Sequence, residues 1–290
     1  MTMHTLATKA MTVNLTIGLW QGHRLDKSAS ADVTERAGAN PDAARVNKLL
    51  VTKDSLAAVG TAGNALRTHF YTNTLPWRDN GDRVLTRQLY LKFIEQHEAL
   101  KGAYSDAVEK FLTEDYPREI QRAEFRMGTL FNPDDYPTAG KLRGKFYVAL
   151  EIAPITTSGD FRVELDAKHV EQLRNEMDVA AEARVKTAMQ SVWQKLFDAV
   201  KHAQERLAVP EGRLYDTTVT NITDLIELAP GLNLTDDPQL VSICKEIDDV
   251  FGSTTTKELR KDSSMRSAVA TEAEEILEKM RGFQNIFGGA

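Results

Sequence analysis

The segment Asp166–Leu207 contains no glycine or proline and predicts one continuous helix, with the Asp166 side chain as its N-cap. Its apolar residues recur in steps of three and four, so they fall on one stripe. At about 1.5 Å per residue the helix is about 60 Å long, more than a compact domain of this size buries along its full length. We therefore expect it to project or to pair. The stripe consists of Val170, Leu173, Met177, Ala181, Val185, Ala188, Val192, Leu196, Ala199, Ala203 and Leu207.

Small residues at many positions of this stripe favour close, antiparallel, coiled-coil-like packing. The expected partner is a second long helix that begins near Thr86, because its apolar residues from Leu89 to Phe111 also share one stripe. Pairing with a second copy of the chain is the alternative.

Three segments alternate apolar and polar residues, as strands with one buried face do: Val13–Leu19, Phe146–Ile152 and Phe161–Leu165. A loop containing glycine joins the last two, so they read as a β-hairpin, and the first segment is its natural third strand. Three strands need a cover on their apolar face. The sequence therefore predicts an α+β, predominantly α-helical fold, with long antiparallel helices packed on a small three-stranded antiparallel sheet.

Two regions are expected. Residues 1–207 form a mixed core with the N-terminal strand, the helical pair, the hairpin and the long helix, and residues 208–290 form a C-terminal helical region with a short apolar tail. Thr235 or Asp236 is the expected cap of the helix that starts at Pro238, and a break is expected at Ala229-Pro-Gly231. The further predicted helices are Asp42–Tyr71, Arg118–Met127, Leu214–Leu228, Pro238–Phe251 and Lys257–Arg281.

Composition excludes several classes of protein. The formal net charge of -6 argues against a protein whose whole surface grips nucleic acid. No uninterrupted apolar run approaches the roughly 20 residues needed to cross a bilayer, and Met1–Trp20 lacks the continuous apolar segment of a secretory signal. We expect no membrane association and a cytoplasmic location. The single cysteine, Cys244, lies in a helical apolar pattern and is predicted to be a core residue.

The sequence contains no recognisable motif for catalysis or for cofactor binding. It has neither a phosphate loop ending in Gly-Lys-Ser/Thr nor a strand-linked Gly-x-Gly-x-x-Gly. The six histidines are scattered, and the adjacent acids Asp134 and Asp135 need further ligands to hold a metal. We expect no enzyme activity, no cofactor, no metal and no catalytic residue.

Aromatic residues, arginines and turn formers crowd together around Thr74–Arg83. One interpretation is a structural corner in which Trp77 and Tyr71 plug the end of the helices. The others are a patch that grips phosphates and stacks bases, as single-strand binders do, and a protein-docking loop. The candidate residues are Arg67, Tyr71, Trp77, Arg78, Arg83 and Arg87, with a basic helical stripe of Arg118, Arg122 and Arg126 that would extend the patch.

The C-terminal tail is apolar and flanked by glycines. Its residues Phe283, Ile286 and Phe287 either fold onto their own domain or dock on a neighbouring subunit.

Four motifs give the chain a resemblance to a known family: Thr74-Leu-Pro-Trp-x-Asp-Asn-Gly-x-Arg83, Leu130-Phe-Asn-Pro-x-Asp-Tyr-Pro137, Gly159-Asp-Phe-Arg-Val163 and Leu232-Asn-Leu-Thr-Asp-Asp-Pro238. From about Val13 to Phe251 the sequence resembles a domain of unknown function found in phages and mobile elements. Genes of that family often lie near genes for a MoxR-like AAA+ ATPase and a von Willebrand A-type protein. The resemblance assigns no activity and no functional residue.

These observations favour a non-enzymatic phage or mobile-element accessory protein in the host cytoplasm. It would self-associate as a homo-oligomer and act as an adaptor or scaffold, with an AAA+ ATPase and a von Willebrand A-type protein as partners. The alternative is a protein of phage replication or recombination that binds single-stranded DNA.

Overall fold

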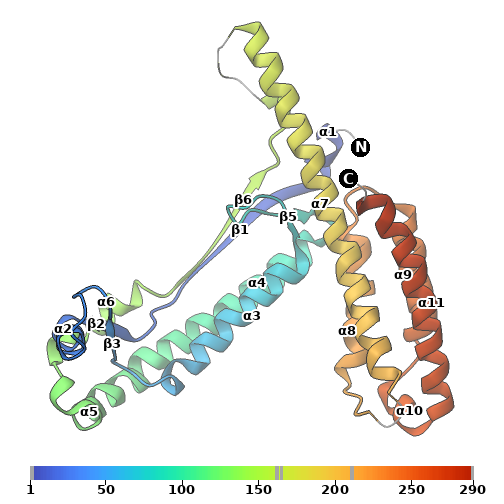
Figure 1. The fold of residues 1–290 in the computed structure, drawn as a ribbon. Helices are drawn as coiled ribbons and strands as arrows, with labels where there is room; N and C mark the ends of the chain where they lie inside the picture. Colours follow the sequence, from blue (N-terminus) through green and yellow to red (C-terminus); the bar gives the residue numbers. More distant parts are fainter. Residues whose placement is uncertain (1–2, 161–162, 164–165, 210–211, 289–290) are drawn as a thin grey trace. The chain divides into compact units, whose positions relative to one another are not determined.

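The computed structural model describes residues 3–160, 163, 166–209 and 212–288, and the side chains of these residues from Thr5 to Gly282 (Figure 1). Helices dominate this part of the chain, and its strands form small antiparallel sheets, so the predominantly helical α+β class is confirmed. The chain divides into two compact units. Unit 1 comprises Met1–Asn14, Tyr71–Phe93 and Glu151–Ala290, and unit 2 comprises Leu15–Phe70 and Ile94–Leu150.

Within the described part of unit 1, four helices form a bundle. Consecutive helices alternate in direction, each packs on the next, and the last returns to pack on the first (Figure 1). Short connections between antiparallel neighbours are typical of such bundles. The helices are α7 (Ala167–Leu207), α8 (Thr217–Leu232), α9 (Pro238–Phe251) and α11 (Ser263–Gly288), with the short α10 (Thr256–Lys261) between the last two.

The predicted bounds of the long helix are confirmed. The Asp166 carboxylate accepts a hydrogen bond from the backbone N–H of His169 at 3.2 Å, and α7 ends at Leu207. The second half of its stripe faces the bundle core, and burial of each large apolar side chain there contributes about 1.5–3 kcal/mol. The buried residues of that half are Ala188, Met189, Val192, Trp193, Leu196, Val200, Ala203 and Leu207.

The helix that packs along α7 is α11, with α8 on another side. The sequence predicted the helix after Thr86 as the partner of α7, and that prediction is wrong. The amphipathic C-terminal helices present enough apolar surface to enclose the second half of α7. Before Ala181, the stripe residues Val170, Leu173 and Met177 are half-buried. Short elements lie against this first half, namely α1 (Met3–Lys9), β4 (Leu75–Pro76) and a 3₁₀ turn at Ser158–Asp160.

Arg266 joins the end of α7 to the start of α11. Its guanidinium is buried, and it donates from Nε to the Leu207 carbonyl at 3.1 Å and from Nη2 to the carbonyls of Arg206, at 2.8 Å, and Val209. The last carbonyls of a helix have no partner within the helix, so a cation placed there satisfies them. Arg266 thereby closes the ring of four helices.

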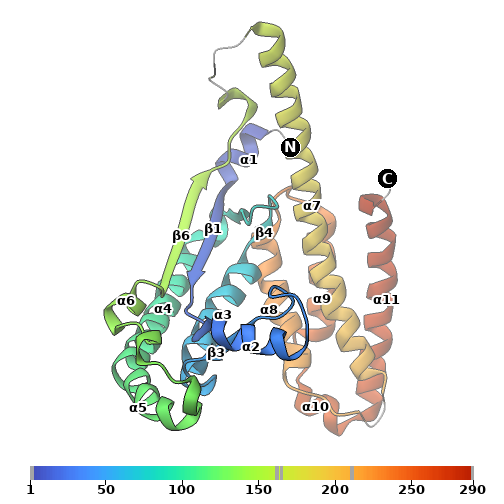
Figure 2. The ribbon, with the colours of Figure 1, turned by 60° about the vertical axis from the view of Figure 1, so that its left-hand side comes forward.

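The sheet has four strands in the order β4-β5-β1-β6, so the predicted three-stranded sheet is wrong. The N-terminal strand lies beside β6, as expected (Figure 2). The short strands β4 and β5, which extend the sheet on the other side, escaped prediction because neither has a full alternating pattern. The second strand of the predicted hairpin, Phe161–Leu165, lies outside the described residues except for Val163. The strands are β1 (Ala10–Gly18), β4 (Leu75–Pro76), β5 (Arg83–Thr86) and β6 (Tyr147–Pro154).

Unit 2 packs around a cluster of rings. Tyr116 meets Trp20 edge-on at a centroid distance of 5.7 Å, and Phe111 lies within 6.2 Å of the ring centroids of Trp20, Tyr116 and Phe146. Such tilted pairs stabilise a core beyond their area burial. The elements that supply or surround this core are parts of α3 (Ala57–Asn73) and α4 (Arg87–Lys110), a π-helical turn (Phe111–Asp115), α5 (Tyr116–Met127) and α6 (Ala139–Arg143).

A two-stranded sheet of β2 (His23–Asp26) and β3 (Val46–Leu49) adjoins α2 (Lys27–Arg36) in unit 2. Lys48 on β3 forms salt bridges with Asp26, at 3.0 Å, and with Asp135, and its side chain is buried. The predicted helix Asp42–Tyr71 is therefore wrong in its first half. Strand pairing and the buried ion pairs of Lys48 outweigh the helical spacing of the apolar residues there.

The C-terminal helix bounds differ from the prediction at four points. Helix α8 begins at Thr217, where Leu214 was predicted. Helix α8 continues through Pro230 to Leu232, because Gly231 fits against Leu89 and its carbonyl accepts a 2.6 Å hydrogen bond from the Thr86 hydroxyl. The cap of α9 is Asp237, whose carboxylate accepts from the Gln239 N–H at 2.9 Å. The predicted last helix is divided into α10 and α11, and the backbone of α11 stays helical to Gly288, whereas the side chains of Phe283, Ile286 and Phe287 lie outside the described ones.

Replacing Arg266 with leucine should lower the free energy of unfolding by about 2–4 kcal/mol, because hydrogen bonds from a charged group contribute about 1.5–3 kcal/mol and three carbonyls at the end of α7 lose their donor. Urea unfolding followed by circular dichroism measures this. Ser267→Ala, at the exposed neighbouring position, should stay within about 0.5 kcal/mol of the wild type. Equal stability of the leucine variant and the wild type would contradict this role of Arg266.

Candidate functional site

The segment Thr74–Arg83 is a hairpin held by hydrogen bonds. The backbone N–H groups of Trp77 and Arg78 both donate to the Asp82 carbonyl, at 3.2 and 3.1 Å, and Gly81 takes the positive φ of +94° that the turn requires. Asn14 donates to the Asp82 carboxylate at 3.0 Å, and this hydrogen bond lowers the pKa of that carboxyl below its usual value. The loop is therefore fixed in shape.

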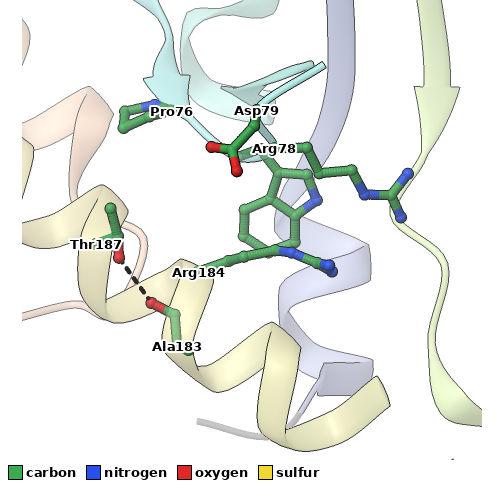
Figure 3. Close-up of a pocket in the computed structure, with 7 residues that line it drawn as sticks. Pro76, Arg78, Asp79, Ala183, Arg184 and Thr187 are labelled. Carbon is green, nitrogen blue, oxygen red and sulfur yellow. Dashed lines mark hydrogen bonds between the residues drawn. The ribbon is translucent and has the colours of Figure 1, made fainter. Parts of the chain in front are cut away.

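A cavity of about 300 Å³ lies between this hairpin and the first half of α7 (Figure 3). Arg184 on α7 extends over the indole ring of Trp77, with 5.9 Å between the guanidinium carbon and the ring centroid. Trp77 is only 5 % exposed, so its ring is not free to stack on a base. The cavity is lined by Pro76, Trp77, Arg78, Asp79, Ala183, Arg184 and Thr187.

Two further cations lie around Tyr71. Arg83 donates from Nε and Nη2 to the hydroxyl and the carbonyl of Thr74, both at 2.7 Å, and its guanidinium carbon lies 4.8 Å from the centroid of the Tyr71 ring. Lys195 on α7 donates to the Tyr71 carbonyl at 3.1 Å. Burial lowers the pKa of Lys195 to about 8, and the nearby charge of Arg83 adds to this effect.

Neither Arg83 nor Lys195 forms a salt bridge with a carboxylate among the described residues. Two partly buried cations held by neutral acceptors carry an uncompensated positive charge. This place, with the exposed ring of Tyr71, is suited to an anion. We call Tyr71, Arg83 and Lys195 the cation pair site.

The other two candidate arginines of unit 1, Arg78 and Arg87, are exposed, whereas Arg83 is half-buried. Arg78 lies 3.5 Å from Asp82, which makes it part of a local ion pair. Arg87, at the start of α4, is exposed. The structure thus brings Tyr71, Trp77, Arg78 and Arg83 together on one hairpin and its entry.

The remaining candidate arginines belong to unit 2 and have local partners in most cases. Arg67 donates to the Asn64 side chain at 3.2 Å, and Arg118 lies 3.6 Å from Glu114. Arg126 donates to the Leu50 carbonyl at 2.7 Å. Arg122 is exposed, and no polar partner for it is found among the described residues.

The sequence did not point to Arg184, Thr187 and Lys195, which complete the site from α7. They lie about one hundred positions after the hairpin, and nothing in a helical pattern says which loop a given face meets. The spacing did hold one signal, since Arg184 and Lys195 are three helical turns apart and share a face.

The described residues contain no group of three or more His, Cys, Asp or Glu side chains that could hold a metal ion. Cys244 is buried, as predicted, and burial raises the pKa of its thiol to about 11, which disfavours the reactive thiolate.

Among the described helices, none combines the length and the apolar character that a membrane span requires.

Comparison of the chain with models of protein families, with curated proteins and with solved structures gave no match.

Replacing Lys195 with methionine should change how stability depends on pH. The lysine is charged in both states below pH 8, where its burial costs free energy, and this cost disappears as the pH rises from about 8, the folded pKa, to 10.5, the unfolded value. The unfolding free energy of the variant minus that of the wild type should therefore fall across this range. Urea unfolding at several pH values from 7 to 10 measures it.

The matched control is Lys201→Met, because Lys201 is an exposed lysine of the same helix. Its difference from the wild type should be flat over the same pH range. A flat difference for Lys195→Met as well would contradict the burial of its charge.

Proposed function

We propose that the protein is a non-enzymatic adaptor or scaffold that self-associates through the first half of α7. The observation that carries this is the change of environment along the apolar stripe. From Ala181 onward the stripe enters the bundle, whereas Val170, Leu173 and Met177 stay only half-buried on a helix that the bundle supports. Apolar residues in register on a rigid helix gain free energy when a second helix covers them.

The charges of this segment favour a second copy as the partner. Between Lys168 and Lys186 the helix has four basic and four acidic residues, so two copies do not repel each other through net charge. We infer a coiled-coil-like, antiparallel pairing of the two arms. The basic residues are Lys168, Arg174, Arg184 and Lys186, and the acidic residues are Glu171, Glu176, Asp178 and Glu182.

A pair of bundles joined by their arms would offer two copies of every other surface to a partner. This arrangement suits an accessory protein of a phage or mobile element that links other proteins. The resemblance to the phage family suggests an AAA+ ATPase and a von Willebrand A-type protein as the linked partners.

Replacing Leu173 and Met177 together with glutamate should abolish self-association. Light scattering after size-exclusion chromatography at micromolar concentration should give more than 32.3 kDa for the wild type and 32.3 kDa for the double variant. The control is the double variant Gln172→Glu, Asn175→Glu, which adds the same charge at exposed positions and should keep the larger mass. A strictly monomeric wild type would overturn the proposal.

A second candidate function, binding of single-stranded DNA, is favoured by the cation pair site. Arg83 and Lys195 could contact phosphates, and the ring of Tyr71, which is 55 % exposed, could stack on a base. Trp77 is excluded from this role by its burial. The net charge of -6 limits such binding to a short segment of the strand.

Binding of a fluorescent single-stranded oligonucleotide should weaken steeply with salt if this second function holds. Tyr71→Ala should weaken it about tenfold, because stacking on one base contributes about 1–3 kcal/mol. Lys195→Met should also weaken it, whereas Lys201→Met should have little effect. Fluorescence anisotropy measures the dissociation constants, and no binding at low salt would remove this candidate.

A further inference from the structure

Phe125 is 97 % exposed on α5. Arg118 and Arg122 lie seven and three residues before it, so the three side chains share one face of the helix. Single exposed aliphatic residues are common on protein surfaces, but an almost fully exposed phenylalanine on the same helix face as two arginines has the composition of an interface anchor. We call Phe125, Arg118 and Arg122 the α5 knob.

A groove of about 420 Å³ lies between α8 and α9. Its apolar lining includes Ile226, Pro230 and Val241, of which Val241 is 55 % exposed. Its polar lining includes the carboxylates of Glu227 and Asp248 and the amine of Lys245. No salt bridge of Glu227 or Asp248 is found among the described residues.

We propose that the α5 knob of one copy inserts into the α8–α9 groove of a second copy. The phenyl ring would cover the apolar lining, and Arg122 would face Glu227 and Asp248. This commits to a second copy because the knob and the groove are complementary in both polarity and charge. Among the described residues Arg122 has no carboxylate partner, and in the groove the two carboxylates of Glu227 and Asp248 outnumber the single amine of Lys245. The contact is separate from the α7 arm and adds a second surface to the self-association proposed above.

Because the knob and the groove are different surfaces, two copies can exchange this contact reciprocally, or it can repeat from copy to copy into a ring or a filament. In either case it adds to the pairing of two α7 arms, which by itself stops at a dimer. Both contacts together would link dimers into larger assemblies as the concentration rises.

Single-stranded nucleic acid is the competing occupant, because an aromatic ring flanked by arginines also suits a base and its phosphates. The acidic residues of α5 argue against it. Glu124 is adjacent to Phe125, and Arg118 is already paired with Glu114 and Asp115 at 3.6 and 3.7 Å.

Sedimentation velocity over a range of concentrations tests the proposal. The wild type should form species larger than a dimer, and Phe125→Ala should remove them by raising the dissociation constant of this contact about tenfold or more. Leu91→Ala is the matched control, because Leu91 is also an exposed apolar residue of a helix, at 79 %. It should leave the distribution unchanged.

Charge reversal gives the decisive comparison. Arg122→Glu alone and Asp248→Arg alone should each lose the larger species, since each places like charges in contact, and mixing the two variants should restore them because both contacts become complementary. Both residues are exposed, so neither change should unfold the chain.

Three outcomes would overturn the proposal: larger species that persist in Phe125→Ala, no restoration on mixing, or a loss of oligonucleotide binding as the only effect of Phe125→Ala. The α7 double variant distinguishes this failure from failure of the proposed function. If self-association depends on Leu173 and Met177 but not on Phe125, only the contact between knob and groove is wrong.

Discussion

The burial of the second half of α7 is the interaction on which the rest of unit 1 depends. This half is enclosed by α8 and α11, and Arg266 ties its last carbonyls to the start of α11. Because α7 is continuous, the bundle that holds its second half also fixes the direction of its first half. An isolated helix would fray in water, so the exposed part owes its order to the packed part. One packing event therefore produces both a stable core and a rigid apolar arm.

The same helix shapes the candidate site. It brings Arg184 over Trp77 and Lys195 to the Tyr71 carbonyl, so the hairpin Thr74–Arg83 is fixed against a rigid support. The cation pair site concentrates positive charge that no carboxylate of the described residues compensates through a salt bridge, and this arrangement costs stability, as the lowered pKa of Lys195 indicates. A cost of this kind is common where a protein binds an anionic partner. Of the residues at and beside the hairpin, Trp77 is buried in the fold, the ring of Tyr71 is exposed, and Arg83 and Lys195 are half-buried.

Local patterns predicted the long elements well and the tertiary relations poorly. The bounds of α7, the start of α9 and the end of α5 follow from capping and from breaks at glycine, which are properties of neighbouring residues. The strands β4 and β5 are too short for an alternating pattern. Strand β3 has helical spacing but pairs with β2, and the buried Lys48 adds salt bridges with Asp26 and Asp135. The partner of α7 could not be read from the sequence, because several amphipathic helices offered a suitable stripe. The exposure of Phe125 could not be predicted for the same reason, because a helical pattern does not show which aromatic side chains other elements bury.

Hydrogen exchange along α7 at two protein concentrations tests the central claim most directly. The account predicts slow exchange for amides from Ala188 to Leu207 at both concentrations, because their opening requires the bundle to unfold. Amides from Ala167 to Ala180 should exchange faster in dilute solution and become protected when the protein is concentrated and the arms pair. Protection of the first half that does not change with concentration would contradict the claim that this arm is an association surface.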